Sequence, residues 1–166
     1  MRSLVALALM MPLLAAPALA QSADTVTGSG RTVDADIIMV DKQRVILWGV
    51  DAPERDQICT IGDQKWACWD GAKNAMDAIL ATGEVTCTLT GDKDPFGRRH
   101  GTCTIDGKDV GESFVRSGYG RAYVEQTDAY LAAEAEAKAD KLGVWQEGAK
   151  VDDPWVWRKR NPGGFR

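Results

Sequence analysis

Residues 25–50 combine β-branched and other apolar residues with short polar interruptions, which is the pattern of successive strands. Apolar side chains gather at 37–40 and again at 45–48. The polar triplet 41–43 lies between these two runs and has the composition of a turn. The pattern therefore predicts three strands in this part of the chain, two of them joined by a tight hairpin.

A second pair of strands is predicted further along the chain. Apolar residues and threonines alternate at 85–89 and at 101–105, and the intervening stretch 92–97 contains Asp, Pro and Gly. Folding the chain about this turn sets Cys87 opposite Cys103, on the same face as the apolar residues. The register therefore favours a disulfide between these two cysteines.

Three helices are expected from the spacing of apolar residues and from the residues that end a helix. Starting at Ala72, apolar side chains recur at positions i, i+3, i+4, i+7 and i+8, which is the stripe of an amphipathic helix. A shorter helix and an alanine-rich helix follow it. The predicted helices are 69–81 ending before Gly83, 109–117 ending before Gly118, and 127–142 capped by Thr127 and ended by Gly143.

The remaining segments are predicted to be less regular. Residues 58–66 are predicted to form a loop, 119–124 a short strand, and 146–166 an extended tail packed on the domain. The resulting order, β-β-β-α-β-β-α-α, lacks the helix between most strands that a parallel α/β sheet requires. It fits an α+β protein, mainly β, with a five-stranded OB-fold barrel and about three packed helices.

The first 20 residues have the features of a secretory signal peptide. A basic start at Arg2 precedes the apolar run 4–14, and small residues lead up to a cleavage signature at Ala20. The alternative, a membrane anchor, is disfavoured because the run is short and no second one follows it. We therefore predict a signal peptide at 1–20, a mature domain at 21–145, a periplasmic or secreted location, and no membrane attachment after signal removal.

Charge and cysteine content narrow the classes of partner. The chain has a net charge of −4, and removal of the signal peptide takes away one arginine and no acidic residue. Overall charge does not draw an acidic protein to nucleic acid, so a polyanionic substrate has to be bound by a local site. Export favours disulfides, and the spacing of the four cysteines, with His100 as the single histidine, does not fit a zinc ribbon. With Cys87 and Cys103 paired, Cys59 and Cys68 remain to form the second bridge.

Four acidic residues gather at two points near the ends of predicted strands, Asp34 with Asp36 and Asp51 with Glu54. A hairpin that joins Asp36 and Asp51 would hold two carboxylates that repel each other unless a hard cation such as Ca²⁺ or Mg²⁺ lies between them. Glu54 could then hold a water molecule as a general base. By spacing alone, ordinary acidic residues in turns are the more common explanation.

Three short segments and two later landmarks shift the balance from ordinary acidic residues in turns towards a metal site. The segments are Val33-Asp34-Ala35-Asp36, Leu47-Trp48-Gly49-Val50-Asp51-Ala52-Pro53-Glu54 and Phe96-Gly97-Arg98, and the landmarks are Gly118 and Lys141-Leu142-Gly143-Val144-Trp145. Together they resemble the signature of the thermonuclease (staphylococcal nuclease-like) family. The resemblance covers roughly Val33 to Trp145 and implies an OB-fold with a calcium-dependent phosphodiesterase site.

The resemblance also implies a role for each matching residue. Asp36 and Asp51 would bind one Ca²⁺, with Mg²⁺ less suited, and the main-chain carbonyl of Ala52 would assist them. Glu54 would orient or deprotonate the attacking water. Arg98 would bind the phosphate and stabilise charge in the transition state.

The sequence departs from the family pattern on the phosphate side of the site. The family has an arginine five residues before the second metal-binding aspartate, where this chain has Ile46. Arg44 lies two residues earlier on the same predicted strand face, about 7 Å away, and either reaches the site or points into solvent. Phe96 replaces the family's tyrosine before Gly-Arg, and Ile37 replaces the threonine after the first metal-binding aspartate. The metal half of the site is therefore better preserved than the phosphate half.

Other candidate residues have structural alternatives. Tyr123 is an approximate match for the base-stacking tyrosines of the family and is equally compatible with a core position. Trp155 and Trp157 precede Arg158-Lys159-Arg160, and this segment either contacts nucleic acid or packs the tail onto the barrel. Ser113 has no neighbouring histidine or acidic pattern, so a serine hydrolase is not supported.

These inferences favour an exported, monomeric, calcium-dependent nuclease that hydrolyses DNA and RNA phosphodiester bonds by metal-assisted attack of water. One alternative is a catalytically weakened thermonuclease-like OB domain that binds nucleic acid or protein. Another is a structural protein of the cell envelope. Arg44 placed close to Ile46 at the site favours the enzyme, whereas an apolar wall there favours the binding module.

Overall fold

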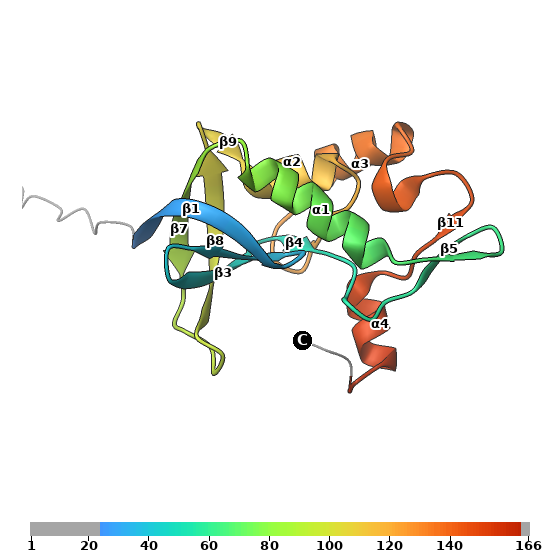
Figure 1. The fold of residues 1–166 in the computed structure, drawn as a ribbon, viewed down its shortest axis with the longest axis horizontal. Helices are drawn as coiled ribbons and strands as arrows, with labels where there is room; N and C mark the ends of the chain where they lie inside the picture. The colour runs from blue at the N-terminus through green and yellow to red at the C-terminus, as the bar shows by residue number, and fades with distance from the viewer. Residues whose placement is uncertain (1–23, 164–166) are drawn as a thin grey trace, which may run out of the picture.

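A long strand, β1 (Thr25–Asp34), begins the barrel that organises the molecule (Figure 1). In this computed structural model, which describes residues 24–163, β2 (Ile37–Val40) and β7 (Glu84–Thr90) flank β1, and the strand order is β3-β2-β1-β7-β8-β9. β3 (Gln43–Leu47) also pairs in parallel with β8 (Arg98–Ile105), which closes the barrel. The predicted OB-type, mainly β architecture is confirmed, because the described chain forms a closed five-stranded mixed barrel accompanied by four helices.

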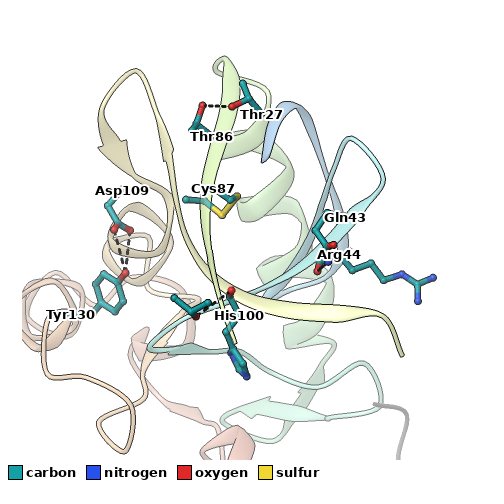
Figure 2. Close-up of a disulfide and its surroundings, with 10 residues drawn as sticks. Thr27, Gln43, Arg44, Thr86, Cys87, His100, Asp109 and Tyr130 are labelled. Atoms are coloured by element: carbon teal, nitrogen blue, oxygen red, sulfur yellow. Dashed lines mark hydrogen bonds between the residues drawn. A yellow bond between two sulfur atoms is a disulfide. The ribbon is translucent and has the colours of Figure 1, made fainter. Parts of the chain in front are cut away.

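The alternation of residues along the strands explains the apolar interior of the barrel. In β7 every second residue is buried, while the threonines face outward. β7 pairs with β8 in the predicted register, so Cys87 lies opposite Cys103 and forms a disulfide with it (Figure 2). The second predicted disulfide, Cys59–Cys68, is also present. Both predicted bridges are therefore confirmed.

The helices cover the barrel largely where the apolar stripes predict them. α1 (Cys68–Leu80) packs one face against the core, and α2 (Val110–Arg116) begins at Asp109, its N-cap. Figure 1 shows α1 lying across the barrel, with α2 and α3 (Leu131–Ala139) along the same upper edge. The buried residues of α1 are Cys68, Ala72, Met76 and Leu80.

Short strands complete the structure and correct one expectation. They are β4 (Val50–Asp51), β5 (Cys59–Ile61), β6 (Gln64–Trp66), β9 (Lys108–Asp109), β10 (Arg121–Ala122) and β11 (Ala149–Lys150). Residues 58–66, predicted to form a loop, contain the β5–β6 hairpin, and β5 also pairs with β11. Strands of three residues are too short to show an alternation of apolar and polar positions, so the sequence pattern did not reveal them.

The alanine-rich helix is shorter than predicted at both ends. Its expected cap, Thr127, accepts a hydrogen bond from a main-chain N–H two residues on (3.2 Å), which forms a local turn instead of a helix start. Tyr130 is buried ahead of α3, and its hydroxyl donates to Asp109 (3.2 Å). At the other end Lys141 has a φ of 55°, which is incompatible with a continuing helix. The prediction of a helix over 127–142 is therefore wrong at its termini.

The segment after Trp145 was expected to be extended, but it contains β11 and a fourth helix, α4 (Pro154–Arg160), and a 3₁₀ turn (Gly143–Trp145) leads into it. Pro154 occupies the first helical turn, where its fixed φ favours a helix start, and it is buried. In Figure 1, α4 lies below β5 and β11, apart from α2 and α3. The C-terminal segment thus adds a helical element to the same part of the molecule as β5.

Two expectations concern membranes and export. Within the part of the chain that the structure describes, the helices are all too short or too polar to cross a membrane. The predicted signal peptide at 1–20 lies outside the described residues, and it stays a prediction.

Candidate active site

A cavity of about 430 Å³ lies at the junction of the β1–β2 turn, β4, the start of β8, and α4. Its walls carry four carboxylates, three basic side chains, one imidazole, two larger aromatic rings and several apolar groups. The lining residues are Asp34, Asp36, Ile37, Ile46, Val50, Asp51, Glu54, Arg98, His100, Tyr123, Gln126, Trp155, Arg158 and Lys159. The structure therefore brings the four predicted acids and Arg98 into one cavity.

The β1–β2 turn positions Asp36. Its neighbour Asp34 accepts hydrogen bonds at Oδ1 from the N–H of Ala35 (2.9 Å) and from Nε1 of Trp69 (2.5 Å). The main-chain carbonyl of Asp36 accepts from the N–H of Leu47 at the end of β3 (3.0 Å). These bonds hold the backbone of the turn, so Asp36 is presented to the cavity from a fixed position.

The turn between β3 and β4 positions Asp51. Gly49 in this turn has a φ of +76°, and a Cβ there would lie 2.3 Å from Cγ2 of Thr127, so both conformation and space require glycine. Asp51 is 3% exposed, lies opposite Arg121 in the β4–β10 ladder, and accepts the N–H of Ala52 (3.0 Å). Ala52 itself is buried and does not line the cavity, so the role of its carbonyl stays a prediction.

Glu54 is held through a buried glutamine that no sequence motif reveals. Gln57 is 1% exposed, and its Oε1 accepts the N–H of Glu54 (3.1 Å). The N–H of Gln57 donates to the carbonyl of Glu54 (2.8 Å), and its Nε2 donates to the carbonyl of Asp152 (2.7 Å). Gln57 therefore ties the loop that carries Glu54 to the residues immediately before α4.

The acids of the cavity influence one another's protonation. Burial raises the pKa of Asp36 well above its usual range, and the charges of Asp51, Asp34 and Glu54 raise it further. Burial also raises the pKa of Glu54, although a hydrogen bond with Arg158 opposes the change. In both groups burial is the main cause of the shift, and the positive charge nearby does not offset it.

Arg158 in α4 is the most direct partner of these acids. Its Nη1 donates to Oδ1 of Asp51 (2.8 Å) and to Oε1 of Glu54 (2.5 Å), and its Nη2 donates to Oδ2 of Asp51 (2.7 Å). Hydrogen bonds with Asp51 raise the pKa of Arg158 above its usual range. In the sequence, Arg158 stands out only as part of a basic triplet of the tail. The Asp153-Pro154 pair, typical of a helix start, is the signal that could have revealed α4.

Arg98 lines the cavity from the start of β8. Its Nε donates to Oδ2 of Asp94 (2.6 Å), and its main-chain N–H donates to Oδ1 of the same carboxylate (2.8 Å). The guanidinium also lies over the ring of Phe96, 4.9 Å from its centroid. Asp94 and Phe96 therefore fix the direction of the side chain to which the family resemblance assigns the phosphate contact.

Arg44 does not line the cavity. It is exposed, its Nη1 donates to the carbonyl of Phe96 (3.4 Å), and Figure 2 shows its side chain extending away from the barrel and from His100. Ile46 does line the cavity, and it lies opposite Ile37 in the β2–β3 ladder. The wall where the family pattern places an arginine is thus apolar.

Aromatic side chains form another part of the wall. Tyr123 lines the cavity rather than the core, and its ring centroid lies 5.5 Å from that of Trp155 in α4. Half-buried rings in a cavity wall can stack on nucleic-acid bases. His100 contacts Trp48 edge to face at 5.5 Å, and burial, together with the charge of Arg98, lowers its pKa.

Comparison with known proteins decides the family. The sequence profile described as staphylococcal nuclease homologue matches residues 44–147, which is more than half of the chain. The chain belongs to the staphylococcal nuclease homologue family. The resemblance inferred from the short motifs is thereby confirmed, and family membership supports a nuclease function with nucleic acid as substrate.

Three relatives show how far this similarity extends. Succinoglycan biosynthesis protein ExoI of Rhizobium meliloti is 36% identical over 135 residues, which cover 76% of this chain and 68% of that protein. Endonuclease YncB of Bacillus subtilis is 30% identical over 137 residues, 73% of this chain and 62% of YncB. SPbeta prophage-derived endonuclease YokF of the same species is 30% identical over 139 residues, 74% and 45% respectively. The match therefore spans less than two thirds of each Bacillus protein.

The donor set of this staphylococcal nuclease homologue fits a hard cation in its chemistry. Within residues 24–163 no three His, Cys, Asp or Glu side chains converge as a ready set of metal ligands. The predicted set needs only two, Asp36 and Asp51, with a main-chain carbonyl. Calcium accepts such oxygen donors and takes further ligands from water. Crowded carboxylates that raise the pKa of Asp36 suit a cation, although Arg158 already bonds both oxygens of Asp51.

Proposed function

We propose that this protein is an exported nuclease that hydrolyses phosphodiester bonds of DNA and RNA by calcium-dependent attack of water. The observation that carries the proposal is a single cavity that combines four carboxylates with guanidinium groups from β8 and α4. Carboxylates suit a cation and an attacking water, whereas guanidinium groups suit phosphate oxygens. A member of a nuclease family needs both in one place.

Each residue has a defined task in this proposal. Asp36 and Asp51 hold one Ca²⁺, which supplies Lewis-acid polarisation of the phosphate and a lower pKa of water when bound. Glu54 accepts the proton of the attacking water, and its raised pKa brings it nearer to the pH at which a general base works best. Arg98, oriented by Asp94, binds the phosphate and stabilises the charge that develops on its oxygens.

Export to the periplasm or the medium is part of the proposal. Residues 1–20 have the composition of a signal peptide, and both pairs of cysteines are disulfide-bonded. Such bridges persist in oxidising compartments and are rare in a reducing cytosol. We propose a monomer as the working form.

Digestion of single-stranded DNA by the mature protein, residues 21–166, tests the function. We expect cleavage in the presence of Ca²⁺ and no cleavage when a chelator is added. Calorimetric titration of the Asp36→Ala, Asp51→Ala double variant should show no Ca²⁺ binding. Absence of cleavage by the wild type contradicts the nuclease, and undiminished Ca²⁺ binding by the double variant contradicts the metal site.

A binding module is the second candidate, because Ile46 and Ile37 make one wall of the cavity apolar and Arg44 does not reach it. In that case the wild type binds single-stranded DNA without cutting it. Ile46→Arg then produces a large gain of cleavage, since it restores a guanidinium at the family's position. Arg44→Ala is expected to be silent under either function.

A further inference from the structure

Helix α4 has contacts of its own that dock it beside the cavity. Asp153, the residue before the helix, forms an ion pair with the buried Arg121. The carbonyl of Asp152 accepts a hydrogen bond from the buried Gln57 (2.7 Å), and Pro154 is buried in the first turn. None of these contacts involves Arg158, so the helix presents that side chain to the cavity without depending on it for docking.

The guanidinium of Arg158 meets two acids to which the proposed function gives different tasks. It forms a bidentate pair with Asp51 and a single hydrogen bond with Glu54. The same planar fork matches a carboxylate and a phosphate equally well. A cation that takes over the oxygens of Asp51 therefore releases a guanidinium that already lies in the substrate cavity.

The side chains around Arg158 suit the binding of a nucleotide. They therefore favour a role for Arg158 in substrate binding over a purely structural ion pair. Trp155 and Lys159, from the same helix, also line the cavity, and Trp155 stands next to Tyr123. Together they provide a positive charge for a backbone phosphate and aromatic faces for bases. The part of the cavity wall that β3 contributes is apolar at Ile46.

We propose that Arg158 is the second phosphate-binding residue of this active site, supplied by α4 in place of the arginine that the family carries on β3. The inference rests on the proposed nuclease function. In the protein without metal, the guanidinium neutralises part of the charge of Asp51 and Glu54. With cation and substrate bound, it binds a non-bridging oxygen of the scissile phosphate together with Arg98.

Three variants of α4 test this proposal. Arg158→Ala removes the guanidinium, Arg158→Lys keeps a charge but not the fork, and Arg160→Ala is the matched control. Arg160 lies on the same helix, pairs with Asp152 and does not line the cavity. With a single-stranded DNA oligonucleotide and saturating Ca²⁺, we expect kcat of Arg158→Ala to fall by roughly 10² to 10³. Arg158→Lys should recover part of this loss, and Arg160→Ala should match the wild type.

Calcium binding without nucleic acid gives an independent readout. Calorimetry should show that Arg158→Ala binds Ca²⁺ more tightly than the wild type, because Asp51 no longer has to release a guanidinium. Arg160→Ala should leave the affinity unchanged. Weaker Ca²⁺ binding by Arg158→Ala would mean that Arg158 only holds the ligands in place, and it would overturn the proposal.

The remaining outcomes separate this inference from the nuclease function itself. A wild type that cleaves DNA while Arg158→Ala cleaves equally well or faster refutes the role of Arg158 and leaves the function standing. A wild type that does not cleave refutes the function. Fluorescence anisotropy with the same oligonucleotide then decides the inference: binding at least tenfold weaker in Arg158→Ala alone supports it, and equal binding in all variants overturns it.

Discussion

Two clusters of charged residues share the β4–β10 ladder, in which Asp51 lies opposite Arg121, but their charges are balanced differently. The cavity cluster consists of the four cavity acids, Asp34, Asp36, Asp51 and Glu54, and of Arg158, which bonds to two of them. Arg98 and Lys159 line the same cavity outside this cluster, and Arg98 pairs with Asp94 instead. The anchor cluster consists of Arg121, Glu134, Lys138 and Asp153. Carboxylates outnumber guanidinium groups in the cavity cluster, even when the exposed Arg55 near Asp34 (3.9 Å) is added. Acids and bases are equal in number in the anchor cluster.

The difference appears in the pKa values of the buried acids. Burial alone would raise the pKa of Glu134, but hydrogen bonds from Lys138 (2.6 Å) and the N–H of Ala122 (3.1 Å), with the charge of Arg121, lower it overall. Burial and neighbouring acids raise the pKa of Asp36 instead. The anchor cluster therefore favours the ionised form of its buried acid, whereas the cavity cluster disfavours it, and this is the imbalance that the proposed cation and substrate would relieve.

The largest expected effect is a loss of activity without a loss of stability when Glu54 of the cavity cluster is replaced. Glu54→Gln keeps the size of the side chain and an oxygen for Arg158 but removes the proposed general base. We expect kcat on single-stranded DNA to fall by roughly 10² to 10⁴, with the free energy of unfolding nearly unchanged. Asp56→Asn, an exposed neighbour in the same loop, is the control and should retain full activity. Substantial activity in Glu54→Gln would remove Glu54 from the mechanism.

The anchor cluster should respond in the opposite way. Glu134→Gln removes the buried carboxylate that pairs with both Arg121 and Lys138 and leaves Arg121 with Asp153 alone. We expect a loss of about 2–3 kcal/mol in the free energy of unfolding. Urea denaturation measures this loss. Glu136→Gln, on the exposed face of the same helix, breaks only a surface pair with Arg116 and should cost less than about 1 kcal/mol. Equal losses in the two variants would show that the anchor cluster has no special role.

The regular parts of the molecule could be predicted from the sequence because their signals are local. Alternation in β7 and β8 predicted the hairpin and its Cys87–Cys103 bridge, and the apolar stripe from Ala72 predicted α1 within a residue or so at each end. The short motifs likewise predicted which acids, together with Arg98, meet in the cavity. The hairpin, its bridge and α1 depend on residues that are close in the sequence or joined by one turn, whereas the meeting of Arg98 with the acids was predicted from the family resemblance.

The features that the sequence did not reveal depend on contacts between segments that are far apart in the chain. Arg158 is separated from Asp51 by 107 positions, and no periodicity connects them. Their contact follows from Gln57 and Asp153, which fix the start of α4 against the barrel. The start of α3 was likewise set by the burial of Tyr130 rather than by a capping threonine. Tertiary contacts overrode local preference at both places.

Asp36→Asn should stabilise the metal-free protein while abolishing Ca²⁺ binding. The substitution removes one of the crowded charges of the cavity cluster, and we expect a gain of about 1 kcal/mol in the free energy of unfolding at neutral pH. Urea denaturation in the presence of a chelator measures the gain, and calorimetry measures the loss of binding. Asp63→Asn, in the exposed β5–β6 turn, should change neither. A destabilised Asp36→Asn variant would show that the ionised Asp36 is well paired after all.

The smallest expected effect is a difference in pH dependence between the clusters. It concerns the changes in the free energy of unfolding caused by Asp36→Asn and by Glu134→Gln. The pKa of Asp36 is higher in the folded state than its usual value near 4 in the unfolded chain. Between these two pKa values the folded protein binds more protons than the unfolded chain. The wild type therefore loses stability as the pH rises through that window. The advantage of Asp36→Asn is therefore complete above the window and fades as the pH falls through it. The pKa of Glu134 is lowered, so its contribution is complete above the usual value and is lost only as the pH falls through the lowered one. Urea denaturation from pH 7 to pH 3 should thus show the Asp36→Asn difference fading at a higher pH than the Glu134→Gln difference. The reverse order would mean that the charges of the two clusters are balanced in the same way.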